Sequence, residues 1–366
     1  MKSAITTSIV LALLAAFLFL GGVNCKHNFV DPYAEPDTTS HNFTWQSWRF
    51  GGEAGSSYLN DVAIIDENNI WAVGTIYLKD STGQPDPNIY NAVHWNGSEW
   101  EVKRVSVLYR GNIITPPLYG IYAFSANDIW LSSGVPVHGD GTNWAQFHLF
   151  DMGVLNQNDG YLTKLWGKSS SDLYYVGTLG TIAHYNGQRW RKVASGTNLD
   201  IQDIWGIVDT KTQEKLILCA ASDKYQSSEM KIIRILPQNV VGEFDWTPQR
   251  KVHSVWFDVP TRIYACGSGF FIYKNGQWQQ DETLPTIFKN RVRANHRNDL
   301  FLVGDLGLLT HYNGKSSRVY DSLSLPQGNY EGLAVRDDLV VAVGWNGDRA
   351  VVLRGVRANQ PKHYIF

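Results

Sequence analysis

The chain has 366 residues, and its 32 Lys and Arg against 34 Asp and Glu give a formal net charge of −2. This balance offers no electrostatic case for nucleic acid binding, which calls for a clear excess of basic residues. Hydrophobic residues make up 43% and charged residues only 18%, which excludes an intrinsically disordered chain. An aromatic content of 13% together with 33 glycines favours an all-β, turn-rich protein.

Residues 1–25 are predicted to be a lipoprotein-type signal peptide. Lys2 precedes an apolar run over residues 9–20, which is about a dozen residues and short for a membrane span of roughly 20. The sequence Gly-Gly-Val-Asn-Cys that ends at Cys25 resembles a bacterial lipobox. The resemblance implies lipidation of Cys25 and a protein held on a membrane. Ordinary signal-peptidase cleavage and an uncleaved anchor are the alternatives.

Residues 26–41 contain two prolines and no hydrophobic periodicity, so we expect a flexible tether. No later apolar stretch approaches the length of a membrane span. We therefore expect a folded body over residues 42–356 and a C-terminal tail over 357–366. The expected location is exported and anchored to a cell-envelope membrane, on its periplasmic or outer-membrane face.

The body consists of one unit repeated seven times. The clearest copy covers residues 162–190, and others pass through residues 298–314 and 68–100. A small residue ends the second apolar run of each copy, at Gly74, Ser133, Gly177, Ala220, Gly267, Gly304 and Gly344. Their spacing averages about 45 residues, which is typical of a propeller blade of four strands.

Each copy supports four antiparallel strands. A short aliphatic strand, such as residues 61–65 or 201–205, is followed by an Asn-Asp or Ser-Asp turn whose side chains should satisfy the turn backbone. A β-branched and aromatic strand follows, then a third strand that ends at Asn-Gly, a strong hairpin signal. The fourth strand begins near a Trp (Trp100, Trp190 or Trp278). No segment shows the 3.6-residue period that a helical solenoid requires.

The last copy has only three strands, over residues 332–335, 339–343 and 349–354, which would leave a sheet edge exposed. Residues 44–50 read as a fourth strand without a blade of its own. We therefore predict that this segment pairs with the last blade. The fold class is an all-β, seven-bladed β-propeller closed by an N-terminal strand.

The blade pattern Asp-[Ile/Leu]-aromatic, Val-Gly, His-[Tyr/Trp]-Asn-Gly and Trp resembles that of bacterial exported seven-bladed β-propeller lipoproteins, over residues 42–356. The resemblance implies the fold and no particular function. Some members carry a glucosyltransferase label. This sequence has no Asp-x-Asp, no phosphate-binding loop and no βαβ alternation that would support it.

Three histidines and two cysteines suggest sites that the repeat argues against. His94, His184 and His311 share one motif position but fall in blades one, three and six, too far apart to bind one zinc ion. We expect them to be structural, with no metal site. Cys219 and Cys266 fall at matching second-strand positions of neighbouring blades, beyond disulfide reach, so we expect buried free thiols.

The starts of the first strands predict a candidate site. First strands line the channel of a propeller, so the polar residues that open them should surround one mouth of that channel. The predicted mouth residues are Asp61, Tyr119, Lys164, Asp203, His253, Arg291 and Glu331. Either these groups pair with one another and hydrate the channel, or they bind a polar ligand or partner.

Long loops in blades one to four should emerge on the same face, where binding usually resides. They cover residues 75–90, 107–117, 151–161 and 222–230. Their tyrosines would add aromatic contact area, namely Tyr77, Tyr90, Tyr109, Tyr161 and Tyr225.

Two functions remain open. The favoured one is a monomeric, membrane-tethered binding or scaffolding module for a protein or glycan of the cell envelope, without cofactor or enzymatic activity. The alternative is a carbohydrate-active enzyme, either a hydrolase, a lyase or a glycosyltransferase-like protein, acting at the channel mouth. It requires two carboxylates among Asp61, Asp203 and Glu331 to converge at about 5–10 Å.

Overall fold

A computed structural model describes residues 35–209, 212, 214–223 and 229–358. The predicted signal peptide with Cys25, most of the predicted tether, Tyr225 and most of the C-terminal tail lie outside these residues. Within the described part of the chain, no helix has the length and apolar character needed to cross a membrane.

Seven four-stranded antiparallel sheets make up the described body, as predicted. Blade one contains β2 (Tyr58–Asp66), β3 (Asn69–Ile76), β4 (Tyr90–Trp95) and β5 (Trp100–Lys103). Blade two contains β8 (Gly120–Ser125), β9 (Asp128–Ser132), β10 (Pro136–Gly139) and β11 (Trp144–Gln146). Blade three contains β12 (Leu162–Ser169), β13 (Asp172–Gly177), β14 (Ile182–Tyr185) and β15 (Trp190–Val193).

The second half of the chain repeats the same order. Blade four contains β16 (Ile201–Val208), β17 (Lys215–Ser222), β18 (Met230–Ile235) and β19 (Val241–Phe244). Blade five contains β20 (Val252–Val259), β21 (Arg262–Gly267), β22 (Gly269–Lys274) and β23 (Gln277–Gln280). Blade six contains β24 (Lys289–His296), β25 (Asp299–Gly304), β26 (Leu309–Tyr312) and β27 (Ser317–Val319). Blade seven contains β28 (Gly328–Arg336), β29 (Leu339–Asn346), β30 (Arg349–Arg357) and β1 (Phe43–Phe50).

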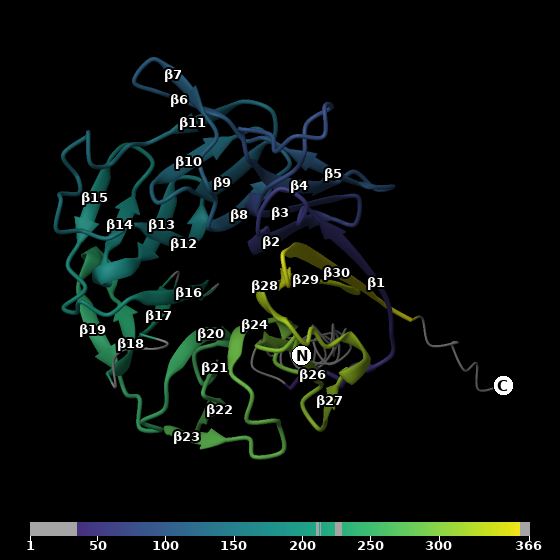
Figure 1. The fold of residues 1–366 in the computed structure, drawn as a ribbon. Helices are drawn as coiled ribbons and strands as arrows, with labels where there is room; N and C mark the ends of the chain where they lie inside the picture. The colour runs from purple at the N-terminus through teal and green to yellow at the C-terminus, as the bar shows by residue number, and fades with distance from the viewer. Residues whose placement is uncertain (1–34, 210–211, 213, 224–228, 359–366) are drawn as a thin grey trace, which may run out of the picture. The chain divides into compact units, whose positions relative to one another are not determined.

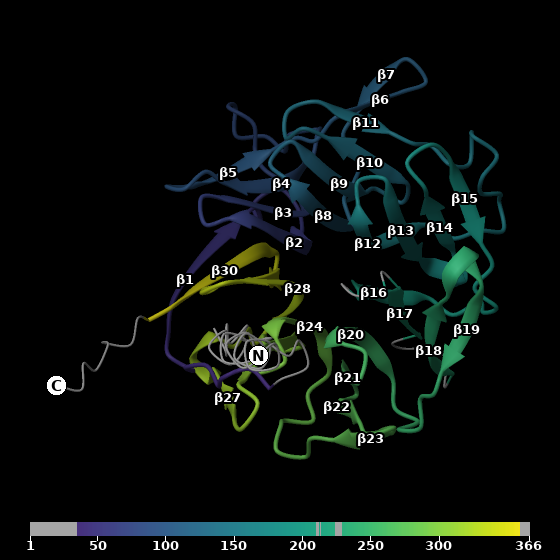
Figure 2. The same cartoon turned by 180° about the vertical axis from the view of Figure 1, so that it is seen from behind.

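The blades form a ring around a central axis (Figures 1 and 2). The first strand of each blade contacts the first strands of both neighbours, from β2 through β8, β12, β16, β20 and β24 to β28 and back to β2. These seven inner strands therefore surround the channel. A short hairpin of β6 (Val107–Tyr109) and β7 (Asn112–Ile114) comes between blades one and two in the chain and contacts β11. Three short 3₁₀ turns cover Thr178–Gly180, Pro237–Asn239 and Asp321–Leu323.

The N-terminal strand closes the ring, which confirms the prediction. β1 pairs with β30 over its whole length, with Trp48 opposite Val352 and Trp45 opposite Gly355. The strand covers residues 43–50 rather than 44–50. β1 therefore covers the edge of β30 that three C-terminal strands alone would leave exposed, and it is the outer strand of blade seven.

The hydrophobic core lies between neighbouring blades. One buried cluster, for example, joins Trp166 and Tyr174 of blade three to Ile204 and Cys219 of blade four. Second strands are the most deeply buried because they are covered on both faces, as the unbroken burial of Ile70–Ile76 shows. Such two-sided burial explains why these strands read as continuous apolar runs rather than as alternating ones.

Each first strand except β8 contains a β-bulge near its start, a feature that the sequence did not reveal. The pairing register shifts between Leu59 and Asp61 in blade one, and at the equivalent place in blades three to seven. In these six strands the pairing register passes over Asn60, Thr163, Gln202, His253, Asn290 and Glu331. A bulge turns a side chain away from the regular alternation, so consecutive residues can both face the channel.

The repeated small residue lies opposite this bulge. A Cβ on Gly177 would lie 1.8 Å from the carbonyl oxygen of Tyr161, and one on Gly74 would lie 2.1 Å from that of Tyr58. Glycine is therefore required by close backbone approach, and not only by turn geometry. In blade four the pairing partner of Ile201 is Ala221, so the predicted anchor Ala220 is wrong by one residue.

The Asn-Gly turns are not all alike, and one expectation about the turns is corrected. Asn275 and Gly276 both have positive φ, but Asn96 does not. The Asn96 side chain instead caps its four-residue loop, accepting hydrogen bonds from the backbone N–H groups of Ser98 and Glu99. The aspartates that open second strands, in contrast, do not accept hydrogen bonds from the turn backbone. Asp128, for example, accepts hydrogen bonds from the side chains of Trp130 on its own strand and of His138 on β10.

Candidate functional site

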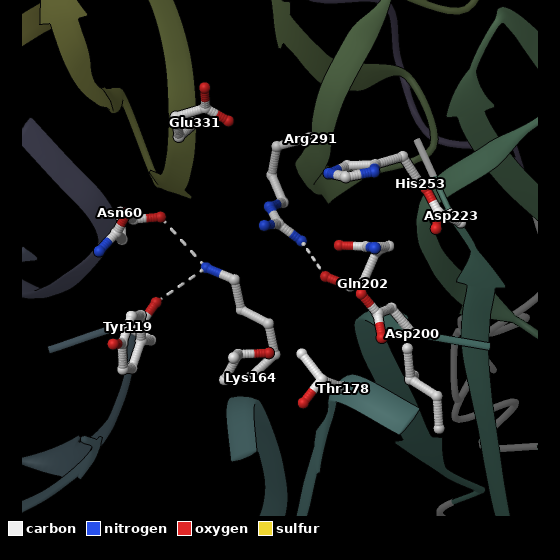
Figure 3. A pocket seen from close by; sticks show the side chains of 12 residues that line it. Asn60, Tyr119, Lys164, Thr178, Asp200, Gln202, Asp223, His253, Arg291 and Glu331 are labelled. Atoms are coloured by element: carbon white, nitrogen blue, oxygen red, sulfur yellow. Dashed lines mark hydrogen bonds between the residues drawn. The ribbon is translucent and has the colours of Figure 1, made fainter. Parts of the chain in front are cut away.

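A polar cavity of about 380 Å³ opens at the mouth of the channel (Figure 3). We call it the mouth cavity. Its described lining comes from the starts of the inner strands and from the loops before β16 and after β13 and β17. The lining residues are Asn60, Tyr119, Thr163, Lys164, Thr178, Asp200, Ile201, Gln202, Asp223, His253, Arg291 and Glu331.

The bulges supply most of this lining. Five of the six bulge residues line the mouth cavity, and Asn290 is the exception. Asn290 is fully buried and donates hydrogen bonds to Asp305 and to the Tyr330 carbonyl. In blade two, which has no bulge there, Tyr119 occupies the equivalent place directly before β8.

The structure divides the seven predicted mouth residues into two layers. Tyr119, Lys164, His253, Arg291 and Glu331 line the mouth cavity. Asp61 and Asp203 lie deeper, and line a second cavity of about 330 Å³ further along the inner strands. We call this the inner cavity. The bulge separates the layers, because Asn60 and Gln202 take the mouth positions in front of the two aspartates.

Lys164 closes one side of the floor between the cavities, and it lines both. Its ammonium lies 2.9 Å from Asp61 Oδ2 and donates hydrogen bonds to the carbonyl oxygens of Asn60 (3.1 Å) and Tyr119 (3.3 Å). Burial lowers the pKa of Lys164 to about 8, although Asp61 favours the charged form. All three N–H groups are used within the protein.

Asp203 closes the other side of the floor. Its Oδ1 lies 2.8 Å from Arg291 Nη1 and 2.7 Å from Arg293 Nη2, and Ser254 and the backbone of Val255 donate to Oδ2. Burial alone would raise the pKa of Asp203. Arg293 and Arg291 outweigh that effect and hold the pKa well below its ordinary value.

Arg293 is a residue of this network that the sequence reasoning missed. It lines the inner cavity and its guanidinium lies over the Trp205 ring, 4.9 Å from the centroid. Positions two apart on a strand share a face, so the presence of Arg291 two residues earlier was a usable signal. Thr178, Asp200 and Asp223 were also missed, because loop residues carry no strand register.

None of the four described tyrosines from the long loops lines the mouth cavity. Tyr90 lies under the guanidinium of Arg104 and Tyr109 stacks on His148. Tyr77 and Tyr161 are exposed. Tyr225 lies outside the described residues.

The motif histidines hydrogen-bond and stack within their own blades. His184 Nε2 lies 2.9 Å from Asp172 Oδ1, and its ring stacks on Tyr174 with centroids 4.2 Å apart. His94 and His311 make the equivalent contacts in blades one and six. His138 makes the same contacts in blade two. It was not recognised in the sequence because Gly139-Asp140 replaces the [Tyr/Trp]-Asn of the usual motif. No group of three His, Cys, Asp or Glu side chains placed to hold a metal occurs among the described residues.

Part of the predicted tether is bound to the propeller. Thr39 donates to the Asn298 carbonyl and Asn298 donates to that of Pro36, so this segment lies against blade six. His41 Nδ1 lies 2.8 Å from His311 Nδ1, which requires one ring to donate and the other to accept. Burial, followed by His311 and two nearby arginines, lowers the pKa of His41 to about 4.

Cys219 and Cys266 are buried free thiols, as predicted. Their second-strand positions do not match, because Cys219 pairs with Ile204 whereas Cys266 pairs with Ser254, the counterpart of Asp203. The one-residue offset turns them to different faces, so they lie in different inter-blade clusters. Burial raises the pKa of Cys266 to about 12.

Comparison with known proteins shows the fold alone. No protein-family model and no curated protein matches the chain. Among solved structures, "YCF48 bound to D1 peptide" is similar with a TM-score of 0.62 and 14% identity, covering 89% of this chain and 100% of that chain. YCF48 from Cyanidioschyzon merolae is similar with a TM-score of 0.62 and 15% identity, covering 86% of this chain and 98% of that chain. The WD40 β-propeller domain of Doa1 is similar with a TM-score of 0.60 and 14% identity, covering 87% of this chain and 98% of that chain.

Proposed function

We propose that this protein is a binding module that holds a polypeptide partner at the mouth cavity while a lipid on Cys25 tethers it to a cell-envelope membrane. The observation that carries the proposal is the cavity itself. Five of the seven inner strands contribute a polar lining residue at a bulge, and blade two contributes Tyr119 at the equivalent place. Ion pairs fix the floor beneath these residues. A rigid floor under a polar opening is typical of a preformed recognition site.

A polypeptide suits this cavity better than a glycan. Sugar sites usually present aromatic faces, whereas Tyr119 is the only Trp, Tyr or Phe among the described lining residues. In the similar YCF48 structure a D1 peptide is bound, so a propeller of this fold can hold one. Because one fold hosts many functions, the cavity supports the proposal more strongly than the likeness does.

The alternative, a carbohydrate-active enzyme, loses support from the ion pairs. It needs carboxylates that can donate or accept a proton near the substrate. Asp61 is paired with Lys164, and Asp203 is paired with two guanidiniums that hold its pKa well below the ordinary value. Of the three predicted carboxylates, only Glu331 lines the mouth cavity, together with Asp200 and Asp223, which were not among the candidates.

Site-specific photo-crosslinking in the full chain tests the proposal. A photoreactive residue at Thr178, on the cavity lining, should capture a polypeptide in envelope preparations. The same residue at Glu67, on the turn between β2 and β3 at the far end of the inner strand, is the control and should not. His253→Ala should weaken capture through Thr178. Equal capture at both positions, or capture at Glu67 alone, would contradict the proposal.

A further inference from the structure

Arg291 has a buried N–H group that no part of the described protein satisfies. Its side chain is 4% exposed. Nη1 is used, since it lies 2.8 Å from Asp203 Oδ1 and donates to the Gln202 carbonyl at 3.3 Å. Nε is buried and has no hydrogen-bond partner. Because an unsatisfied buried donor is unfavourable, the position marks where an acceptor from outside is needed.

The missing acceptor should be an anion. The floor of the channel holds three cations, Lys164, Arg291 and Arg293, against two carboxylates, Asp61 and Asp203. One positive charge is therefore in excess within a buried network. Lys164 has already donated all its hydrogens, which leaves Arg291 as the group that can receive the anion from the mouth cavity. Figure 3 shows its side chain among the lining residues, between Lys164 and His253.

The upper part of the same cavity is acidic. Asp200 and Glu331 line it nearer the starts of the inner strands than Arg291 does. A ligand with one negative charge at the floor and a positive charge above it would match this distribution. A dianion, or a ligand with a second acidic group, would be repelled by the upper carboxylates.

We propose that the mouth cavity binds a carboxylate side-on to Arg291, as part of a ligand whose neighbouring group is cationic. This inference rests on the proposed function and specifies the end of the partner that enters. A polypeptide chain end with a C-terminal lysine or arginine has this chemistry, and so does a free basic amino acid. Side-on pairing uses two parallel N–H donors of a guanidinium and is the strong, directional way to hold a carboxylate. The cavity volume of about 380 Å³ suits a group of one or two residues.

Isothermal titration calorimetry on the full chain tests the inference with four probes. They are acetyl-Gly-Gly-Lys with a free carboxylate, the same peptide as its C-terminal amide, acetyl-Gly-Gly-Glu, and free lysine. We expect the first to bind, and the amide and the glutamate peptide to bind at least about tenfold more weakly. Binding of free lysine as tight as that of the peptide would identify a small molecule rather than a chain end as the source of the carboxylate.

Variants place the site. Arg291→Gln should weaken binding of acetyl-Gly-Gly-Lys at least about tenfold, whereas Arg104→Gln, which alters a surface ion pair of blade one, should not change it. Glu331→Gln should reduce the preference for the lysine peptide over the glutamate peptide even if Arg291→Gln folds poorly. Equal binding of acid and amide, or no binding of any probe, would overturn the inference. Crosslinking through Thr178 would still succeed in that case, so failure of the proposed function remains distinguishable.

Discussion

Asp203 should be among the most costly side chains to remove from this protein. Its carboxylate accepts from two guanidiniums, one hydroxyl and one backbone N–H, and it is 1% exposed. Asp203→Ala leaves Arg291 and Arg293 as buried charges without a partner. Breaking a buried pair from one side costs about 3–5 kcal/mol. We expect the free energy of unfolding to fall by about that amount in Asp203→Ala. The free energy of unfolding of Asp203→Asn should lie between that of Asp203→Ala and that of the native protein.

Urea unfolding followed by Trp fluorescence measures this loss. The matched control is Asp151→Ala, which breaks an exposed pair with Arg110 and should change the free energy of unfolding much less. A loss at Asp203 no larger than that at Asp151 would show that the floor is not a tightly coupled buried network. The rigid base assumed for the mouth cavity would then be unsupported.

Two further predictions concern ring closure and pH. Gly355→Ala should cost about 1–3 kcal/mol of stability, because the added Cβ would lie 2.2 Å from the Trp45 ring. Gly242→Ala is the control and should be tolerated, since the nearest atom to its Cβ would be 3.8 Å away. Equal unfolding midpoints for the two variants would refute closure by β1. The lowered pKa of His41, about 4 when folded against 6.5 as its ordinary value, means that the unfolded chain binds more protons between these pH values. Stability should therefore fall as pH decreases from 6.5 to 4, and His41→Gln should flatten that slope; an NMR titration placing the pKa of His41 near 6.5 would contradict this.

The repeat made the architecture predictable from the sequence. Asn-Gly hairpins, the small residue after each second strand and, in several blades, the Trp that opens the fourth strand recur with an average spacing of about 45 residues. The missing strand after Arg354 and the surplus strand around Trp45 together implied closure. These signals are local and periodic, so they can be recognised in the sequence without any knowledge of tertiary contacts.

The site was only partly predictable. The identity of the channel-facing positions followed from strand order, but the bulge at Asn60 and Gln202 did not, since it depends on how each first strand pairs with its neighbour. Its effect was to place Asp61 and Asp203 one layer deeper than expected. Pairing partners such as Arg293 depend on distances across the ring, which a sequence does not encode locally.

Hydrogen exchange of the full chain with a captured partner bound is the most direct measurement of where this protein binds. Binding at the mouth cavity predicts slower exchange in the loops over residues 178–181 and 195–200, which lie beside its lining. The turns at the other end of the inner strands, over residues 66–69 and 125–128, should exchange at unchanged rates. Slower exchange confined to those turns would contradict a mouth-bound partner.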